Sequence, residues 1–235
     1  MEKEYVRSLF DNIAFRYDVL NRLLSGGIDL YWRRKAISAL SGLSPKKILD
    51  VATGTADFAI AALGLQPETI IGVDISEQML AIGRQKVRKR NCSDIIQLEY
   101  GDAEHLKYSD NEFDAAIVAF GARNFEDLQR GLNEMYRVIS KQGMIVVLEF
   151  SRPRSLLFKQ IYYMYFKHIL PLVGRIISRD TEAYRYLPDT VMKFPEGDDF
   201  LEFLSRSGFS ALREQRLTFG IVTIYTGVKD QWKKE

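Results

Sequence analysis

The sequence contains little cysteine and little histidine. Its 235 residues include one cysteine, Cys92, and two histidines. A lone thiol cannot form an intramolecular disulfide, and neither histidine has a second ligand at the spacing that a metal site needs. We therefore expect a protein of the reducing cytoplasm, without a disulfide and without a bound metal.

Long hydrophobic runs and a surplus of one charge are missing as well. No uncharged apolar stretch reaches the roughly 18 residues of a membrane-spanning helix, and the charged segment Met1 to Asn12 is unlike a secretion signal. The 33 lysines and arginines nearly balance the 31 aspartates and glutamates. Nucleic acid is not expected as a partner, because phosphate binding requires a strongly basic face.

The sequence does have the apolar content for a large core, since 46% of its residues are hydrophobic. Short runs rich in isoleucine and valine alternate with helical patterns. This is typical of an open α/β sheet with buried parallel strands and helices on both faces. The strands are expected at Ile48 to Ala52, Thr69 to Asp74, Ile95 to Tyr100, Phe113 to Ala119 and Met144 to Phe150, and the clearest helices at Ser76 to Arg90 and Asp127 to Ser140.

Two helices are expected before the sheet. Apolar positions from Val6 to Tyr17 recur at the spacing of one helical face. A second helix is expected near Leu30 to Leu40, after a break at two glycines. Together they predict an N-terminal helical cap over residues 1–42.

The C-terminal part predicts a hairpin and a lid. Phe209 to Leu217 and Ile221 to Val228 are strand-like runs joined by a short bend, so they are expected to add one antiparallel edge strand to the sheet. The insertion 151–198 precedes them, and a segment of that size usually covers an active site. We expect a single domain over residues 1–235 with this helical lid.

The turn after the first strand carries the most specific signal. Ligands of open α/β sheets bind at the carboxyl ends of the strands, and Gly54 would let the backbone come close to a ligand. Asp50 and Asp57 add negative charge, which suits a ligand with cationic groups better than a pyrophosphate. The G-x-G-x-x-G pattern of dinucleotide sites is absent.

Two further strands end in acidic residues. Asp74 follows the second strand, where a carboxylate can accept both ribose hydroxyls of a nucleoside. Asp102, just before Ala103, could accept an exocyclic adenine amine. Each aspartate alone could be a helix cap or a turn former, but the three acidic strand ends together predict a nucleoside site.

These motifs resemble those of the class I, seven-stranded S-adenosylmethionine-dependent methyltransferases. A wider set of motifs is similar to the demethylmenaquinone and ubiquinone-biosynthesis C-methyltransferase family over nearly the whole chain. The set comprises Asp50 to Asp57, Gly72 to Asp74, Gly101 to Ala103, Phe10 to Gly27, Ala119 to Asn124, Met135 to Gly143, Val147 to Pro153 and Tyr184 to Val191. One departure is Ala56, where many members have glycine.

The resemblance implies a Rossmann-like, mostly parallel seven-stranded sheet with S-adenosylmethionine as cosubstrate. The implied reaction is methyl transfer to a ring carbon of a polyprenylated quinol, namely demethylmenaquinol giving menaquinol. The reduced form is expected, because a quinol can supply electrons to the ring and a quinone cannot. The implied cofactor-binding residues are Asp50, Gly54, Thr55, Asp74, Ile75, Asp102, Ala103 and Ala119.

Candidate catalytic residues follow the fourth strand. A cation or donor that stabilises the quinol phenolate would accelerate the step, and Arg123 with Asn124 stands where such groups could face the methyl donor. Arg123 could instead pair with a nearby carboxylate and hold the loop. Asp180, Tyr184 and Tyr186 are second candidates, for the quinol head group, although lid aromatics often only pack.

Three alternatives stay open at this point. The substrate could be a benzoquinol of the ubiquinone pathway or a soluble small molecule, or the chain could be a non-catalytic S-adenosylmethionine-binding partner. A polyprenyl tail predicts peripheral contact with the inner face of the cell membrane through Val6 to Tyr17 and Leu156 to Leu170. Both segments could equally be core helices or a homodimer interface.

Overall fold

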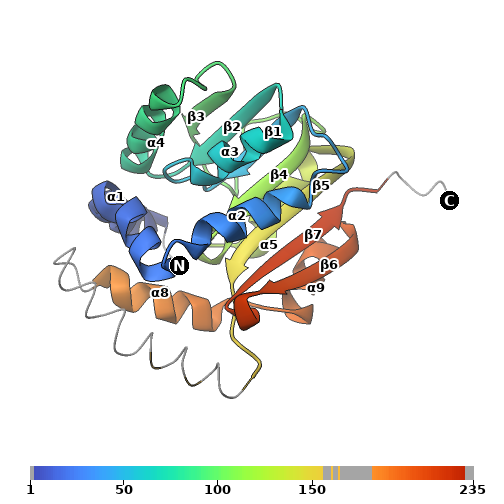
Figure 1. The fold of residues 1–235 in the computed structure, drawn as a ribbon. Coiled ribbons are helices and arrows are strands. Elements are labelled where there is room, and N and C mark those ends of the chain that lie inside the picture. Colours follow the sequence, from blue (N-terminus) through green and yellow to red (C-terminus); the bar gives the residue numbers. More distant parts are fainter. Residues whose placement is uncertain (1–2, 156–159, 161–163, 165–181, 231–235) are drawn as a thin grey trace.

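The computed structural model describes residues 3–155, 160, 164 and 182–230, and of residues 182–185 and 187 only the backbone. In this part of the chain, seven strands form one sheet (Figure 1). They are β1 (Lys47–Val51), β2 (Thr69–Asp74), β3 (Ile96–Tyr100), β4 (Phe113–Ala119), β5 (Ile139–Phe150), β6 (Ser210–Leu217) and β7 (Val222–Val228).

The strand order is β3-β2-β1-β4-β5-β7-β6. All pairings among β1 to β5 are parallel, whereas β7 runs antiparallel to both β5 and β6. The expected seven-stranded, mostly parallel sheet is confirmed. The antiparallel pairing expected at this end is present too, but the strand that runs opposite to the others is β7, one place inside the edge strand β6.

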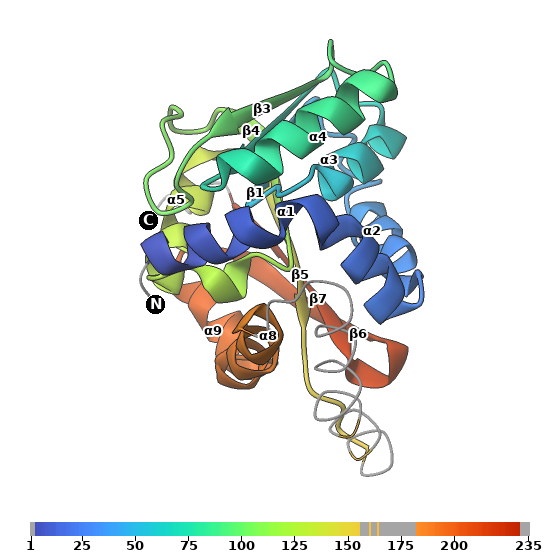
Figure 2. The same cartoon turned by 90° about the vertical axis from the view of Figure 1, so that its left-hand side faces the viewer.

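Helices cover both faces of the sheet (Figure 2). Trp32, Phe58 and Leu80 from α2, α3 and α4 belong to the hydrophobic core of one face, and Met135 and Phe200 from α5 and α9 belong to that of the other. The central strands are thus buried on both sides, as their continuous apolar runs predict. The α-helices of the described residues are α1 (Lys3–Ser25), α2 (Ile28–Ser38), α3 (Asp57–Ala62), α4 (Glu77–Lys89), α5 (Leu128–Val138), α8 (Glu182–Lys193) and α9 (Asp198–Arg206).

Side-chain caps fix where α4 and α5 begin. The Ser76 hydroxyl accepts the backbone N–H of Met79, and the Asp127 carboxylate accepts that of Arg130. Each cap pairs one of the N–H groups that a helix start leaves without a partner. Both helices therefore start at the residue after the predicted boundary.

The first helix crosses the carboxyl edge of the sheet. Figure 2 looks toward this edge and shows α1 lying across it, with α8 beside it. Val6 and Leu9 of α1 form a small hydrophobic core with Tyr186 of α8. No helix among the described residues is long and apolar enough to span a membrane. Of the predicted segment Leu156 to Leu170 the structure describes only Gln160 and Met164, and Asp180 lies outside the described residues.

Candidate active site

The turn between β1 and α3 opens onto a cleft at the carboxyl edge of the sheet. Ala52, Gly54 and Ala56 all have positive φ, at 53°, 56° and 66°. Left-handed backbone costs a residue with a Cβ about 1–2 kcal/mol, so the turn is strained at both alanines. A Cβ added at Gly54 would meet nothing within 4 Å. The backbone there faces open space, as a close approach to a ligand requires.

Asp74 joins the ends of β1 and β2. Its Oδ2 accepts the N–H of Gly54 at 2.8 Å, and its Oδ1 accepts the N–H of Ser76 at 2.8 Å. Burial raises the pKa of this carboxyl to about 6, although these backbone N–H groups favour the ionised form. Each oxygen keeps a lone pair for a further donor, and the residue lines the cleft.

Asp102 lies at the other end of the cleft, under the start of α1. The Lys3 ammonium donates to its Oδ2 at 2.8 Å and also pairs with Glu104 at 2.9 Å. Burial acts to raise the pKa of Asp102, but the bonds from Lys3, the Glu104 N–H and His105 outweigh it and hold the pKa below its usual value. The carboxylate predicted to meet an adenine amine is therefore ionised and in contact with an ammonium.

Asp50 is placed behind the turn, not in the cleft. Its side chain is fully buried, and its Oδ2 accepts a hydrogen bond from the Thr53 hydroxyl at 2.6 Å. Thr53, and not Asp50, lines the cleft. Burial raises the pKa of Asp50 to about 7, against the opposing effects of Thr53 and Arg33. Its Oδ1 has no hydrogen-bond partner among the described residues. The structure thus gives Asp50 a role in shaping the turn, without contact to the cleft.

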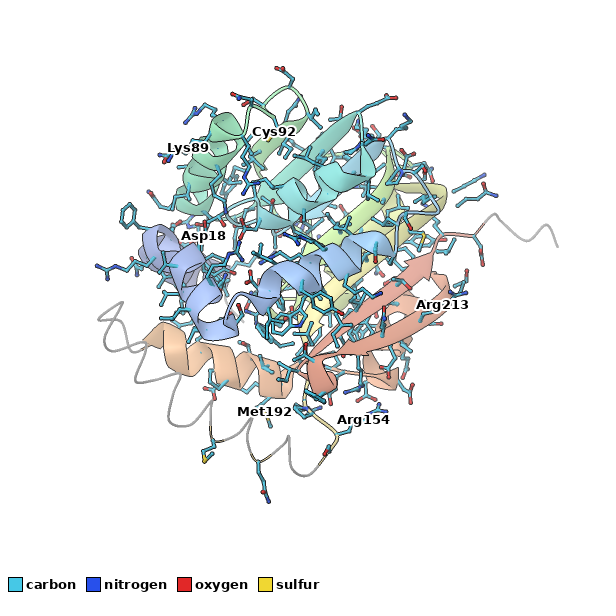
Figure 3. All side chains as sticks on the ribbon, in the orientation of Figure 1. Asp18, Lys89, Cys92, Arg154, Met192 and Arg213 are labelled. Atoms are coloured by element: carbon cyan, nitrogen blue, oxygen red, sulfur yellow. The ribbon has the colours of Figure 1, made fainter. Side chains whose placement is uncertain are left out.

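Polar side chains of α1 tie the helix to the elements around the cleft. Asp11 accepts the Ser76 hydroxyl at 2.6 Å, Asp18 accepts the Thr55 hydroxyl at 2.5 Å, and Arg22 donates to Asp57 at 2.9 Å. Figure 3 labels Asp18 on the side of α1 that meets these elements. The sequence reasoning missed this stripe, although Asp11, Asp18 and Arg22 are spaced as one helical face.

The predicted catalytic pair is split by the structure. Arg123 turns away from the cleft and forms an ion pair with Glu149, Nη1 to Oε1 2.8 Å, in which the side chains are 5% and 0% exposed. Its guanidinium also donates to the Phe120 carbonyl. Asn124, in contrast, lines the cleft. The expectation that the Arg123 side chain faces the methyl donor does not match this geometry, whereas the pairing with a carboxylate does.

Tyr186 supports Asn124 from the lid. Its hydroxyl donates to Asn124 Oδ1 at 2.8 Å, and burial raises the pKa of the phenol to about 12. Its ring lies 6.1 Å from that of Tyr5 in α1. Tyr186 is not part of the cleft lining, and of Tyr184 only the backbone is described.

Most of the predicted cofactor residues do meet at one place. Gly54, Thr55, Asp74, Ile75, Asp102, Ala103 and Ala119 all line the cleft. Residues that the sequence reasoning missed line it too, among them Lys3, Val6, Phe10, Tyr17, Arg33 and Phe58. In the described part of the chain, no cluster of three or more acidic, histidine or cysteine side chains could hold a metal ion.

Comparison with known proteins decides the family. Residues 1–229 match the ubiE/COQ5 methyltransferase family. The chain belongs to this family. Its relatives include a demethylmenaquinone methyltransferase of Bacteroides fragilis, 50% identical over 97% of this chain and 94% of that protein. A ubiquinone/menaquinone biosynthesis C-methyltransferase UbiE of Geobacter sulfurreducens is 45% identical over 96% of this chain and 89% of that protein.

Solved structures agree on the fold of this ubiE/COQ5 family member. A Thermotoga maritima structure described as an S-adenosylmethionine-dependent methyltransferase superposes with a TM-score of 0.68 at 19% identity, covering 95% of this chain and 99% of that one. At that identity the likeness concerns the fold alone. The class I methyltransferase fold expected from the sequence motifs is thereby confirmed.

Membership of this methyltransferase family implies S-adenosylmethionine as the methyl donor, and the cleft suits it. The donor is a nucleoside with a cationic sulfonium and an amino-acid end. Asp74 and Asp102 offer acceptors for hydroxyl and amine donors, and the turn at Gly54 is open to a ligand. The buried Nε of Arg33 has no hydrogen-bond partner among the described residues, so a cationic donor group in the lining is available to an anion.

Proposed function

We propose that this protein transfers a methyl group from S-adenosylmethionine to a ring carbon of demethylmenaquinol, giving menaquinol. The observation that carries the proposal is the 50% identity, over nearly the full length of both chains, to the demethylmenaquinone methyltransferase of Bacteroides fragilis. A relative of the same name from Porphyromonas gingivalis is 41% identical. A benzoquinol is the second candidate, because the Geobacter sulfurreducens relative is named for both quinones.

The sulfonium supplies an activated methyl group, so the protein has to align the ring carbon and make it electron-rich. A phenolic hydroxyl titrates near ~10, and a donor beside its oxygen would favour the phenolate at neutral pH. Asn124 is the member of the predicted catalytic pair that lines the cleft, so we assign this contact to its amide. Arg123 holds the loop through Phe120 and Glu149 and in this way positions the neighbouring Asn124.

The polyprenyl tail would keep the substrate in a membrane, so we also propose that the protein works at the inner surface of the cell membrane. The outer face of α1 supports this, because Phe15, Val19 and Leu23 recur every fourth residue and are 91%, 62% and 56% exposed. A helix with such a stripe can lie in the lipid interface. Replacing all three with serine should abolish cosedimentation with anionic vesicles while methylation of a short-tailed quinol persists. A homodimer joined through this stripe would instead dissociate in the variant.

The deciding experiment for the substrate is transfer of a labelled methyl group from S-adenosylmethionine. Chemically reduced demethylmenaquinol, its oxidised form and a benzoquinol are compared in parallel, with Asp74→Asn as the binding-deficient control. Label in the reduced naphthoquinol alone supports the proposal. Label in both quinols would indicate an enzyme of both pathways, and label in neither would favour a soluble substrate.

The role of Arg123 is tested in the same assay. Arg123→Ala should keep S-adenosylmethionine binding and lose turnover. If this variant methylates at the normal rate, the assigned role is wrong. If it neither binds nor turns over, a general loss of folding has to be measured by thermal unfolding.

A further inference from the structure

Arg33 of α2 is a buried cation that makes no hydrogen bond within the described part of the chain. The residue is 5% exposed and lines the cleft, and its Nε is buried without a partner. The closest carboxylate oxygen is Asp29 Oδ2, at 3.9 Å from Nε, too far for a hydrogen bond. A guanidinium has five N–H donors. Leaving the buried Nε–H unsatisfied is costly, so a partner outside the described chain is expected.

Two aromatic rings hold this guanidinium beside the β1–α3 turn. Its central carbon lies 6.0 Å from the centroid of the Phe58 ring and 5.3 Å from that of Phe120. Both rings also line the cleft, next to Gly54. Such cation–π contacts stabilise the charge and fix its place without using the N–H donors. The donors thus remain available in the cleft.

Asp29 and Asp57, two of the carboxylates near Arg33, are already engaged by other donors. A third, Asp50, interacts with Arg33 electrostatically but lies behind the turn, outside the cleft lining. Asp29 accepts from Arg22 and from Ser25, the latter at 2.9 Å. Asp57 pairs with Arg22 and Lys86. The other cation of the lining, Lys3, is bound to Asp102 and Glu104. Among the described residues that line the cleft, Arg33 is therefore the cationic side chain whose N–H groups donate to no protein acceptor.

We propose that Arg33 binds the carboxylate at the methionine end of S-adenosylmethionine. The proposal rests on that molecule being the ligand of the cleft. The ligand carries two cationic groups, which suit the acidic walls, and one carboxylate, which needs a cationic donor. A planar guanidinium matches a carboxylate with two parallel N–H···O bonds. Arg33 is then a specificity-determining residue that distinguishes the amino-acid end from a plain amine.

The test compares two ligands that differ only in this carboxylate. Calorimetry measures binding of S-adenosylhomocysteine and of its decarboxylated analogue, S-adenosyl-3-thiopropylamine. The wild-type protein should prefer the carboxylate-bearing ligand by about 10- to 100-fold, the size expected for a charge-assisted pair. Arg33→Gln should lose that preference by weakening only the carboxylate-bearing ligand. Arg34→Gln is the matched control, since Arg34 is its exposed neighbour on α2, and this variant should keep the preference.

Three results would overturn the proposal while leaving S-adenosylmethionine as the ligand of the cleft. One is a wild-type protein that binds both ligands equally, which needs no variant at all. Another is an Arg33→Gln protein that loses affinity for both ligands to the same extent, because that indicates a structural role. The third concerns Arg33→Lys, which is measured in case the glutamine variant does not fold. If this lysine variant shows no partial preference for the carboxylate-bearing ligand, the proposal is wrong. Wild-type binding of neither ligand would also overturn the assignment of the cofactor, whereas absent methyl transfer with normal binding concerns only the proposed substrate.

Discussion

The two walls of the cleft use charge in different ways. The donor wall, made by the ends of β1 to β3 with α1, carries carboxylates that line the cleft, Asp74 and Asp102. The acceptor wall, made by the ends of β4 and β5 with α8, has its charges sealed inside as the Arg123–Glu149 pair. A ligand or a proton can reach the charges of the first wall. The sealed pair of the second can act only through the loop that it holds.

This difference separates binding from positioning. Changes at the donor wall should alter ligand affinity and its pH dependence while the fold persists. Changes at the acceptor wall should alter stability or turnover while S-adenosylmethionine affinity persists. The following predictions test that separation, beginning with the largest effect.

Breaking the sealed ion pair should cost the most. Glu149→Ala leaves the buried Arg123 charge without its anionic partner, and such a change typically costs about 3–5 kcal/mol of unfolding free energy. Urea unfolding followed by circular dichroism measures it. Glu77→Ala is the control, because its ion pair with Arg84 is exposed and should contribute at most about 1 kcal/mol. Equal losses in the two variants would contradict the structural role assigned to the acceptor wall.

Removing the Asp74 charge should reduce affinity without unfolding the protein. Asp74→Asn weakens two acceptors for ribose hydroxyls, so S-adenosylmethionine affinity should fall by about 100-fold. Stability should fall by only about 1–3 kcal/mol, because the asparagine keeps one acceptor oxygen for the N–H groups of Gly54 and Ser76 and leaves the other unpaired. Calorimetry gives the affinity, and thermal unfolding checks the fold. Affinity within threefold of wild type would remove Asp74 from the binding site.

Acidification should weaken binding through the same group. The Asp74 pKa is raised to about 6, and the ionised form is the acceptor, so affinity should fall by about tenfold from pH 7 to pH 5. Binding should release a proton in the lower half of this range. Calorimetry in buffers of different ionisation enthalpy measures both effects.

The matching control is the pH profile of Asp74→Asn, which should be flat. Asp50 also titrates in this range, with its pKa raised to about 7, but it lies behind the turn. A slope that persists in Asp74→Asn would assign the pH dependence to Asp50 instead.

Loosening the lid contact should have the smallest effect. Tyr186→Phe removes the 2.8 Å hydrogen bond to Asn124, worth about 1 kcal/mol, so kcat should fall severalfold while S-adenosylmethionine affinity is unchanged. Tyr5→Phe keeps the ring contact with Tyr186 and should leave kcat unchanged. Steady-state kinetics with the reduced quinol measures both variants. A larger loss in Tyr5→Phe than in Tyr186→Phe would argue against the hydrogen bond.

The strands were predictable because their side chains are buried on both faces. β2 and β4 match the predicted ranges, β3 begins one residue later than predicted, and β1 both begins and ends one residue earlier. β5 is the exception, since it begins at Ile139, five residues before the apolar run at Met144. Lys141 and Gln142 in this stretch are exposed, so no apolar pattern marks it. Its start is set by pairing of Ile139 with Phe113 of β4, which is a tertiary contact.

The site was predictable where it depends on topology alone. Carboxyl ends of neighbouring parallel strands meet at one edge, so Asp74 and Asp102 could be placed together from the order of the strands. Glu149 could not be paired with Arg123 in advance, because the two residues are 26 positions apart and meet only through the β4–β5 register. The same holds for Lys3, which reaches Asp102 only once α1 crosses the edge.

The place of β7 in the sheet bears on how the chain folds during synthesis. β7 follows the other six strands in the chain, yet it lies between β5 and β6 and pairs with β5 from Met144 to Phe150. Until the ribosome has released β7, one edge of β5 has no partner, and the cavity that the Tyr225 ring fills beside Phe200 stays empty. A nascent chain therefore presents an open apolar strand edge, a surface prone to aggregation that chaperones bind. Loss of this late strand would divide the sheet, not shorten it.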